Sequence, residues 1–271
     1  MKVQLVRNLA IFLLAGVFAA HAEEPLSQEL PPEQEAAAIR MAEATGLDIY
    51  RHDHAAAVAT DAARKLRKFK KDKRIRGWIT EEQQDGIVVT FIDQTPAALY
   101  RTMVSGDSVS GPVTAYQSPV ALSEYEAGAA AARKAAMESQ FQPCTQNYNP
   151  VVLPRVALLP VTPESGWVVY LLPGTTKTDV VPIGGTYRME IDGSGVVNQR
   201  GFTRTCISLQ NDPRAVGLMI THLLDPIPTE VHVFWSLWVG KSMAVATPPH
   251  GSVWMIEDGR IKLIRRGEAK D

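Results

Sequence analysis

The chain has 271 residues, of which 45% are apolar and 21% are charged, with 28 Lys and Arg against 29 Asp and Glu. This composition is typical of a globular protein and excludes a wholly disordered or fibrous chain. A mean hydropathy near zero, with one long apolar run, excludes a protein that crosses a membrane several times. The length allows one large domain or two smaller ones.

The start of the chain has the layout of a secretory signal peptide. Lys2 and Arg7 precede an uncharged apolar run at 9–20, and residues 20–22 (Ala-His-Ala) form the small-x-small pattern that signal peptidase cleaves. The run is too short to span a bilayer, which needs ~20 residues. We therefore predict that residues 1–22 are removed, that the protein is exported to the periplasm or secreted, and that no transmembrane span remains.

Removal of residues 1–22 leaves 26 basic and 29 acidic residues, a net charge of −3. Neither this balance nor export favours a nucleic acid as partner. Cys144 and Cys206 are the only cysteines, and an oxidising compartment predicts one disulfide between them. Closing a loop of about 60 residues would stabilise the fold by ~4 kcal/mol. Reduced, buried thiols are the alternative.

The N-terminal part predicts a linker at 23–32 and an α+β unit at 33–121. Two helices begin this unit: one ends at Gly46, and the next runs from Asp48 to about Lys71. Four runs rich in β-branched and aromatic residues follow, separated by turn sequences. These predicted strands are residues 74–80, 87–93, 98–104 and 113–116.

The C-terminal unit, residues 122–271, is predicted to hold a helix and a β-rich part with the disulfide. Ser123 and Glu126 form a capping box before a helix that reaches about Gln140. Residues 230–239 are apolar on both faces, which predicts a central strand. The predicted strands are residues 156–159, 167–172, 186–191, 196–206, 216–223, 230–239, 243–246, 253–256 and 260–264.

The fold class that follows is α+β, with a helix and a four-stranded antiparallel meander before a β-rich C-terminal part. Two pairs of segments suggest that the meander occurs twice. Residues 86–91 (GIVVTF) align with 166–171 (GWVVYL), and residues 99–103 (LYRTM) align with 186–190 (TYRME). Duplication explains these matches, and so does the V-x-V pattern that unrelated amphipathic hairpins share.

Four segments, GWVVYLLPGTT, GGTYRMEIDGSG, GFTRTCISL and THLLDPIPTEVHVF, together resemble a family of exported bacterial proteins of unknown activity. The likeness covers roughly the C-terminal half and, more loosely, residues 78–100. It implies export and supplies no catalytic residues. The helix-plus-meander units are also similar to PepSY and cystatin-like modules, which implies an inhibitory or binding role.

The densest group of chemically active side chains comprises His222, Asp225, Glu230 and His232. A stiff turn at 225–228 would place the two histidines across a hairpin. Such a group suits a metal-dependent or acid/base hydrolase. The structural alternative is a pair of hydrogen-bonded histidines, an aspartate that caps the turn and a Glu–Arg ion pair.

Two further motifs predict structure rather than chemistry. Residues 105–111 (SGDSVSG) resemble the first block of GDSL-type hydrolases, but no Asp-x-x-His pair follows Ser108, which favours a glycine-serine turn. His52, Asp53 and His54 lie near a helix start, where neighbours point about 100° apart. The histidines therefore cannot share a helix face, and we predict solvated surface.

Residues 64–76 (RKLRKFKKDKRIR) hold nine basic residues and one acidic residue. Such a density can bind anionic lipid headgroups, phosphates of lipopolysaccharide or an acidic envelope protein. Leu66 and Phe69 share a face that belongs either to the core or to a membrane-inserting edge. The structural alternative is a helix end plus a charged edge strand. The basic residues are Arg64, Lys65, Arg67, Lys68, Lys70, Lys71, Lys73, Arg74 and Arg76.

Taken together, the sequence predicts an exported, non-enzymatic binding or interaction protein of the cell envelope that uses no cofactor and docks on anionic surfaces. A hydrolase centred on His222, Asp225 and His232 is the first alternative. An envelope inhibitor or chaperone-like factor is the second.

Overall fold

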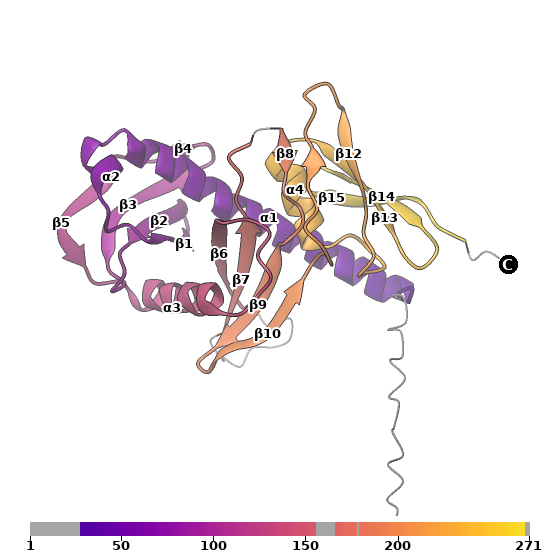
Figure 1. Cartoon of the computed structure of the whole chain (residues 1–271), viewed down its shortest axis with the longest axis horizontal. Coiled ribbons are helices and arrows are strands. Elements are labelled where there is room, and N and C mark those ends of the chain that lie inside the picture. Colours follow the sequence, from indigo (N-terminus) through magenta and orange to yellow (C-terminus); the bar gives the residue numbers. More distant parts are fainter. Residues whose placement is uncertain (1–27, 156–165, 178, 269–271) are drawn as a thin grey trace, which may run out of the picture.

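The computed structural model describes residues 28–155, 166–177 and 179–268. The predicted signal peptide, the first half of the linker and the predicted strand at 156–159 lie outside these residues. The fold is α+β, as predicted: helices pack on sheets that are antiparallel apart from one pair of strands (Figure 1).

One long helix runs through the molecule where one helix ending at Gly46 and a second at 48–71 were predicted. The helices are α1 (Pro32–Arg64, 33 residues), α2 (Arg67–Lys71), α3 (Glu124–Glu138) and α4 (Glu230–Val239). The predicted helix end at Gly46 is wrong. A Cβ at Gly46 would lie 2.5 Å from Cβ of Val233, so this glycine allows α4 to pack closely against α1 and does not end a helix.

The first two sheets are antiparallel and each follows a helix. In the first, β1 (Gly77–Gln83), β2 (Gly86–Ile92) and β3 (Ala98–Ser105) form a meander, and β4 (Ser108–Val109) and β5 (Thr114–Val120) both pair with β3. The second has the order β10-β9-β7-β6, from β6 (Tyr148–Pro154), β7 (Trp167–Pro173), β9 (Tyr187–Asp192) and β10 (Gly195–Gly201).

A two-stranded sheet and a second four-stranded sheet complete the described C-terminal part. The former pairs β8 (Val180–Val181) with β11 (Leu209–Gln210). The latter, called the C-terminal sheet below, has the order β12-β13-β14-β15, from β12 (Gly217–Thr221), β13 (Ser242–Thr247), β14 (Ser252–Glu257) and β15 (Arg260–Arg265). Strands β12 and β13 are parallel, and α4 connects them.

Residues 230–239 form α4 and not the predicted strand. Their Val and aromatic content favours a strand locally, but a parallel β12–β13 pair needs a crossover, which a helix supplies. The backbone N–H of Thr229 donates to Nδ1 of His232 at 3.0 Å in the first turn, and Gly240 ends the helix at φ 66°. The helix is apolar on nearly all sides because protein encloses it.

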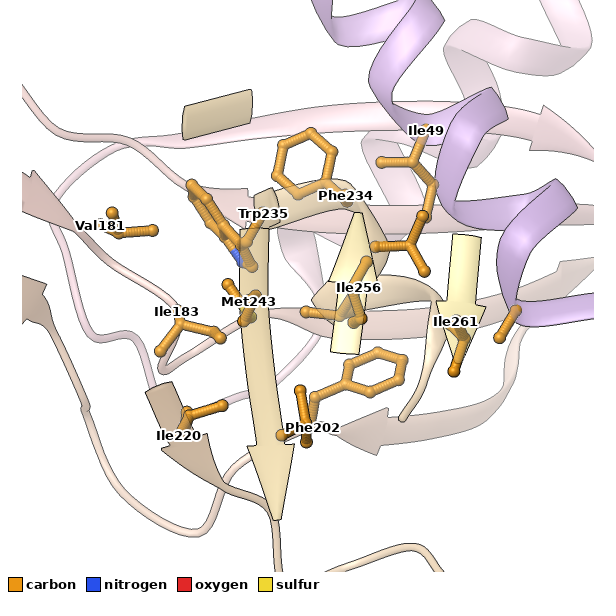
Figure 2. Packing of buried hydrophobic residues seen from close by; sticks show 14 of the residues in the cluster. Ile49, Val181, Ile183, Phe202, Ile220, Phe234, Trp235, Met243, Ile256 and Ile261 are labelled. Carbon is orange, nitrogen blue, oxygen red and sulfur yellow. The ribbon is translucent and has the colours of Figure 1, made fainter. Parts of the chain in front are cut away.

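Buried apolar side chains join these elements into one molecule. Figure 2 shows Ile49 of α1 near Phe234 of α4, with Met243 and Ile256 of the C-terminal sheet in the same cluster. The second half of α1 packs on the first sheet, where Ala59 belongs to another cluster. Helix α1 therefore contributes to the cores of both the first and the last sheet, while α3 packs against both the first and the second sheet.

The aligned segments hold equivalent positions in the first two sheets. Thr90 pairs across the strands with Arg101, and both side chains reach a glutamate of the following helix. The Thr90 hydroxyl donates to Glu126 at 2.7 Å, and Nη2 of Arg101 donates to both carboxylate oxygens at 2.6 and 2.7 Å. Glu126 lies in the first turn of α3, in the predicted capping box with Ser123.

The same arrangement recurs in the second sheet. Tyr170 pairs with Arg188, at the positions that align with Thr90 and Arg101. The Tyr170 hydroxyl donates to Glu230 at 3.1 Å, and Nη1 of Arg188 donates to it at 3.4 Å. Glu230 begins the next helix, α4. The aligned segments thus share a cross-strand register and a polar contact to a helix start.

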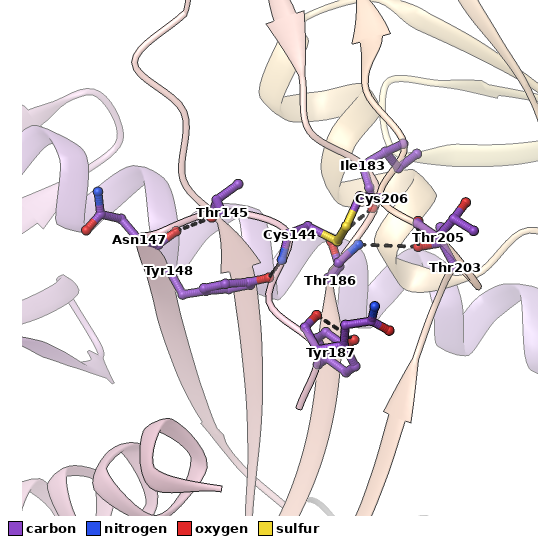
Figure 3. Close-up of a disulfide and its surroundings, with 12 residues drawn as sticks. Cys144, Thr145, Asn147, Tyr148, Ile183, Thr186, Tyr187, Thr203, Thr205 and Cys206 are labelled. Carbon is purple, nitrogen blue, oxygen red and sulfur yellow. Dashed lines mark hydrogen bonds between the residues drawn. A yellow bond between two sulfur atoms is a disulfide. The ribbon is translucent and has the colours of Figure 1, made fainter. Parts of the chain in front are cut away.

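The predicted disulfide joins Cys144 to Cys206, whose Cα atoms are 5.4 Å apart (Figure 3). Strands β6 and β10 are the two outer strands of the second sheet, and the disulfide links the segment before β6 to the segment after β10. Gly185 packs against it with φ +85°, and a Cβ there would lie 2.6 Å from Sγ of Cys144. The Cys144 N–H also donates to the Tyr148 hydroxyl at 2.9 Å.

Candidate functional site

The basic segment, residues 64–76, turns a corner at the end of α1 and passes through α2 into β1. All nine of its basic side chains are exposed. Its apolar side chains face the other way: Phe69 is 9% exposed and contacts Phe91 and Tyr100 edge-on, with ring centroids 4.9 Å apart in each case. Leu66 is half-buried beside the same cluster. The interpretation of these two residues as a membrane-inserting edge is therefore wrong.

One acidic residue fixes the second half of the segment. Asp72 accepts hydrogen bonds from Nε and Nη2 of Arg74 at 2.8 and 2.7 Å and from the Tyr100 hydroxyl at 3.0 Å. These bonds, those from Arg74 above all, hold the pKa of Asp72 well below its usual value. Asp72 is thus a charged partner for Arg74 and ties the loop to the core.

Most cations of the segment lack a carboxylate partner. Beyond Arg74, Arg64 lies 3.8 Å from Asp61, a long contact between exposed groups. Nη1 of Arg76 donates to the backbone carbonyl of Lys73 at 2.7 Å, which orients the guanidinium and leaves its charge uncompensated. In the described part of the chain, no ion pair is formed by Lys65, Arg67, Lys68, Lys70, Lys71, Lys73 or Arg76.

The structure brings together three of the four residues of the predicted hydrolase site. Nε2 of His222 donates to Oδ2 of Asp225 at 2.7 Å, and the rings of His222 and His232 meet edge-on with centroids 4.5 Å apart. Arg200 also donates to Asp225. Glu230 points elsewhere, to Arg188 and Tyr170, as the Glu–Arg alternative predicted.

This histidine cluster is packed inside the protein. His222 and His232 are 3% and 2% exposed, and burial lowers the pKa of His232 to about 3, so its ring is neutral. Its Nδ1 already accepts the Thr229 N–H. Within the described residues, no group of three or more His, Cys, Asp or Glu could hold a metal ion. The geometry is that of a buried structural network.

A cavity of about 390 Å³ lies between α1 and the turns β1–β2 and β3–β4. His54 lines it, stacked on Tyr50 with centroids 5.5 Å apart, and its Nε2 lies 2.8 Å from Oδ1 of Asp107. Asp107 belongs to the 105–111 motif, which forms the predicted turn, with Gly106 at φ +56°. The Arg51–Glu82 ion pair lines another wall. No nucleophile–histidine hydrogen bond is formed among these lining residues.

The prediction that His52, Asp53 and His54 form solvated surface is wrong for the first two. His52 is 3% exposed, with Nδ1 2.8 Å from the Thr80 hydroxyl, and Asp53 is 7% exposed and accepts from Asn149 at 3.3 Å. Burial lowers the pKa of His52 to about 4 and raises that of Asp53 to about 6. Helical spacing from the buried Ile49 places both on its face and could have revealed this.

Comparison with known proteins found no match: no family model, no curated protein and no solved structure matches the chain. In the part that the structure describes, no helix is long and apolar enough to cross a membrane. The basic segment, the histidine cluster and the cavity beside α1 are thus the features on which a function can rest.

Proposed function

We propose that this chain is an exported, non-enzymatic binding protein of the cell envelope, and that its basic segment binds phosphate-rich anionic partners. The observation that carries the proposal is the set of seven exposed cations, within twelve consecutive residues, that form no ion pair in the described part of the chain. One or two cations are enough to stabilise the C-terminal end of a helix, and a few more protect an edge strand from aggregation. Seven cations exceed both structural roles.

The charge is large enough to bind without other contacts. A basic side chain near an anionic surface contributes ~1 kcal/mol, so seven of them would contribute about 7 kcal/mol. That corresponds to a dissociation constant on the order of 10 μM. Because the cations are exposed, salt should weaken binding strongly, as the Debye length falls to about 8 Å at physiological ionic strength.

The histidine cluster supports a non-enzymatic role. A hydrolytic acid or base must reach the proton that it transfers, directly or through one water. His222 and His232 have almost no exposed surface. Nε2 of His222 is hydrogen-bonded to Asp225, and Nδ1 of His232 is hydrogen-bonded to the backbone N–H of Thr229. These bonds hold the segment between β12 and α4 in place.

Equilibrium binding to soluble polyphosphate and to vesicles containing phosphatidylglycerol, at low and at high salt, tests the proposal. The informative variant changes Lys68, Lys70 and Lys71 to Gln. A matched control changes three exposed lysines elsewhere, Lys134, Lys177 and Lys262, to Gln, with the same loss of charge. We expect salt-sensitive binding that only the first variant weakens. Binding to neither ligand, or equal weakening in both variants, would refute it.

A further inference from the structure

We infer that the basic segment docks flat on an anionic phospholipid bilayer, at the depth of the headgroups, by charge alone and without inserting a side chain. The inference rests on the proposed function and specifies its partner and mode of contact. Three features of the segment support it: the spread of its cations outside the two pockets, the position of its apolar side chains and its attachment to the core.

The nine exposed cations are spread along the end of α1, through α2 and over the loop that leads to β1. In α2, Phe69 points inward, and Lys68 and Lys70 on either side of it are exposed. None of the nine cations lines the cavity beside α1 or the hollow next to β12. A single phosphate could therefore meet one or two of these side chains. A plane of headgroups could meet most of them at once, since long lysine stems reach toward a common surface.

The apolar residues of the segment are unavailable to lipid. Leu66, Phe69 and Ile75 are its only apolar residues, and all three pack in or against the cluster between α1 and the first sheet. Interfacial helices that insert carry Trp, Phe or Leu on a free face. Here the apolar face of the segment is packed in the core of the protein. The attraction between the segment and the bilayer must therefore come from the charges, and salt must reverse it.

The segment is also a firm attachment point. Phe69 contacts the rings of Phe91 and Tyr100, and Asp72 accepts a hydrogen bond from the Tyr100 hydroxyl, so two residues of the segment are connected to the first sheet. Figure 1 shows α2 and the C-terminal sheet toward opposite ends of α1. A helix of 33 residues is about 50 Å long. With α1 standing along the bilayer normal, docking through the basic segment would hold the C-terminal sheet some tens of ångströms from the bilayer.

The test combines vesicle sedimentation with lipid monolayers. We expect binding to vesicles of phosphatidylglycerol and phosphatidylcholine, none to phosphatidylcholine alone, and release at high salt. The Lys68, Lys70 and Lys71 to Gln variant should bind roughly 100-fold more weakly, the effect of three surface charges. Replacing the same lysines with Arg should preserve binding, since charge is kept. On a monolayer at bilayer-like pressure, the protein should adsorb without raising the surface pressure.

Circular dichroism and the thermal transition of each variant confirm that it is folded. A rise in surface pressure, or vesicle binding that persists at high salt, would show insertion and overturn the inference. Binding to soluble polyphosphate without binding to anionic vesicles would overturn it too and leave the proposed function standing. Binding to neither would refute both.

Discussion

Replacing Glu126 with Gln should reveal how strongly α3 is held on the first sheet. The carboxylate is 4% exposed and accepts from Arg101 and Thr90 and, at 2.9 Å, from the backbone N–H of Ser123. Gln keeps the size but replaces one acceptor oxygen by a donor, so Arg101 and one further donor lose a partner. Breaking a buried pair costs about 3–5 kcal/mol. Arg101 is 33% exposed and water can solvate it in part, so we expect a loss of about 3 kcal/mol.

The pH dependence separates charge from packing. Burial alone would raise the pKa of Glu126, but the hydrogen bonds from Ser123 and Thr90 and the charge of Arg101 together hold it below its usual value. A carboxyl with a depressed folded pKa stabilises the fold above its unfolded pKa and loses that contribution as the pH falls through its folded pKa. The difference between wild type and E126Q should therefore be full near pH 7 and shrink in acid.

Urea unfolding at a series of pH values measures this difference in the free energy of unfolding. An unchanged m-value shows that the variant and the wild type expose the same surface on unfolding. Glu124 is the matched control, since it lies exposed in the same helical turn, and E124Q should change the free energy of unfolding by less than about 0.5 kcal/mol. E230Q, in the equivalent position with longer contacts, should cost less than E126Q. A loss that stays constant from pH 7 into acid, or one as small as for E124Q, would refute the reasoning.

Three other changes probe the rest of the fold. Asp53→Asn should stabilise the protein above pH 6, by up to about 3 kcal/mol, because burial raises the pKa of Asp53 to about 6 and the wild type loses stability as the pH rises through that value. Equal stability of both proteins at pH 8 in urea would contradict this. Gly185→Ala should lower the melting temperature, since its Cβ would meet Cys144 at φ +85°, whereas Gly193→Ala, with open space around it, should not. Replacing both cysteines with Ser should cost ~4 kcal/mol in denaturant titrations, and a thiol assay on the unfolded, unreduced wild type should find no free thiol.

Local signals were sufficient where the local chain decides the structure. The capping box of Ser123 and Glu126 does begin a helix. The glycine-serine motif at 105–111 forms the turn that was predicted there, between β3 and β4, with Gly106 at φ 56°. The cysteine pair forms the predicted disulfide. Each of these depends on a few neighbouring residues or on a simple count.

Tertiary contacts decided the elements that sequence reasoning missed. A glycine such as Gly46 usually indicates a helix end. Here it is present because Val233, nearly two hundred positions later, occupies the space that a Cβ would fill. Residues 230–239 have strand-like composition, and only the parallel pairing of β12 with β13 requires a helix there. The histidine cluster was found from its residue types, but its burial could not be, because the side chains that cover it come from distant segments.

The double role of α1 has a consequence for how the chain folds. Glu43, near the start of this helix, accepts hydrogen bonds from the guanidinium of Arg260 at 3.0 Å and from the backbone N–H of Ile261 at 2.7 Å, about 218 positions later. The N-terminal half of α1, which packs in the same cluster as Ile261, therefore cannot complete its contacts until the last hairpin has been synthesised. Contacts of such separation slow folding, because loop-closure entropy is lost before they form. A cluster that forms so late would leave the N-terminal half of α1 without its partners while the intervening sheets are synthesised.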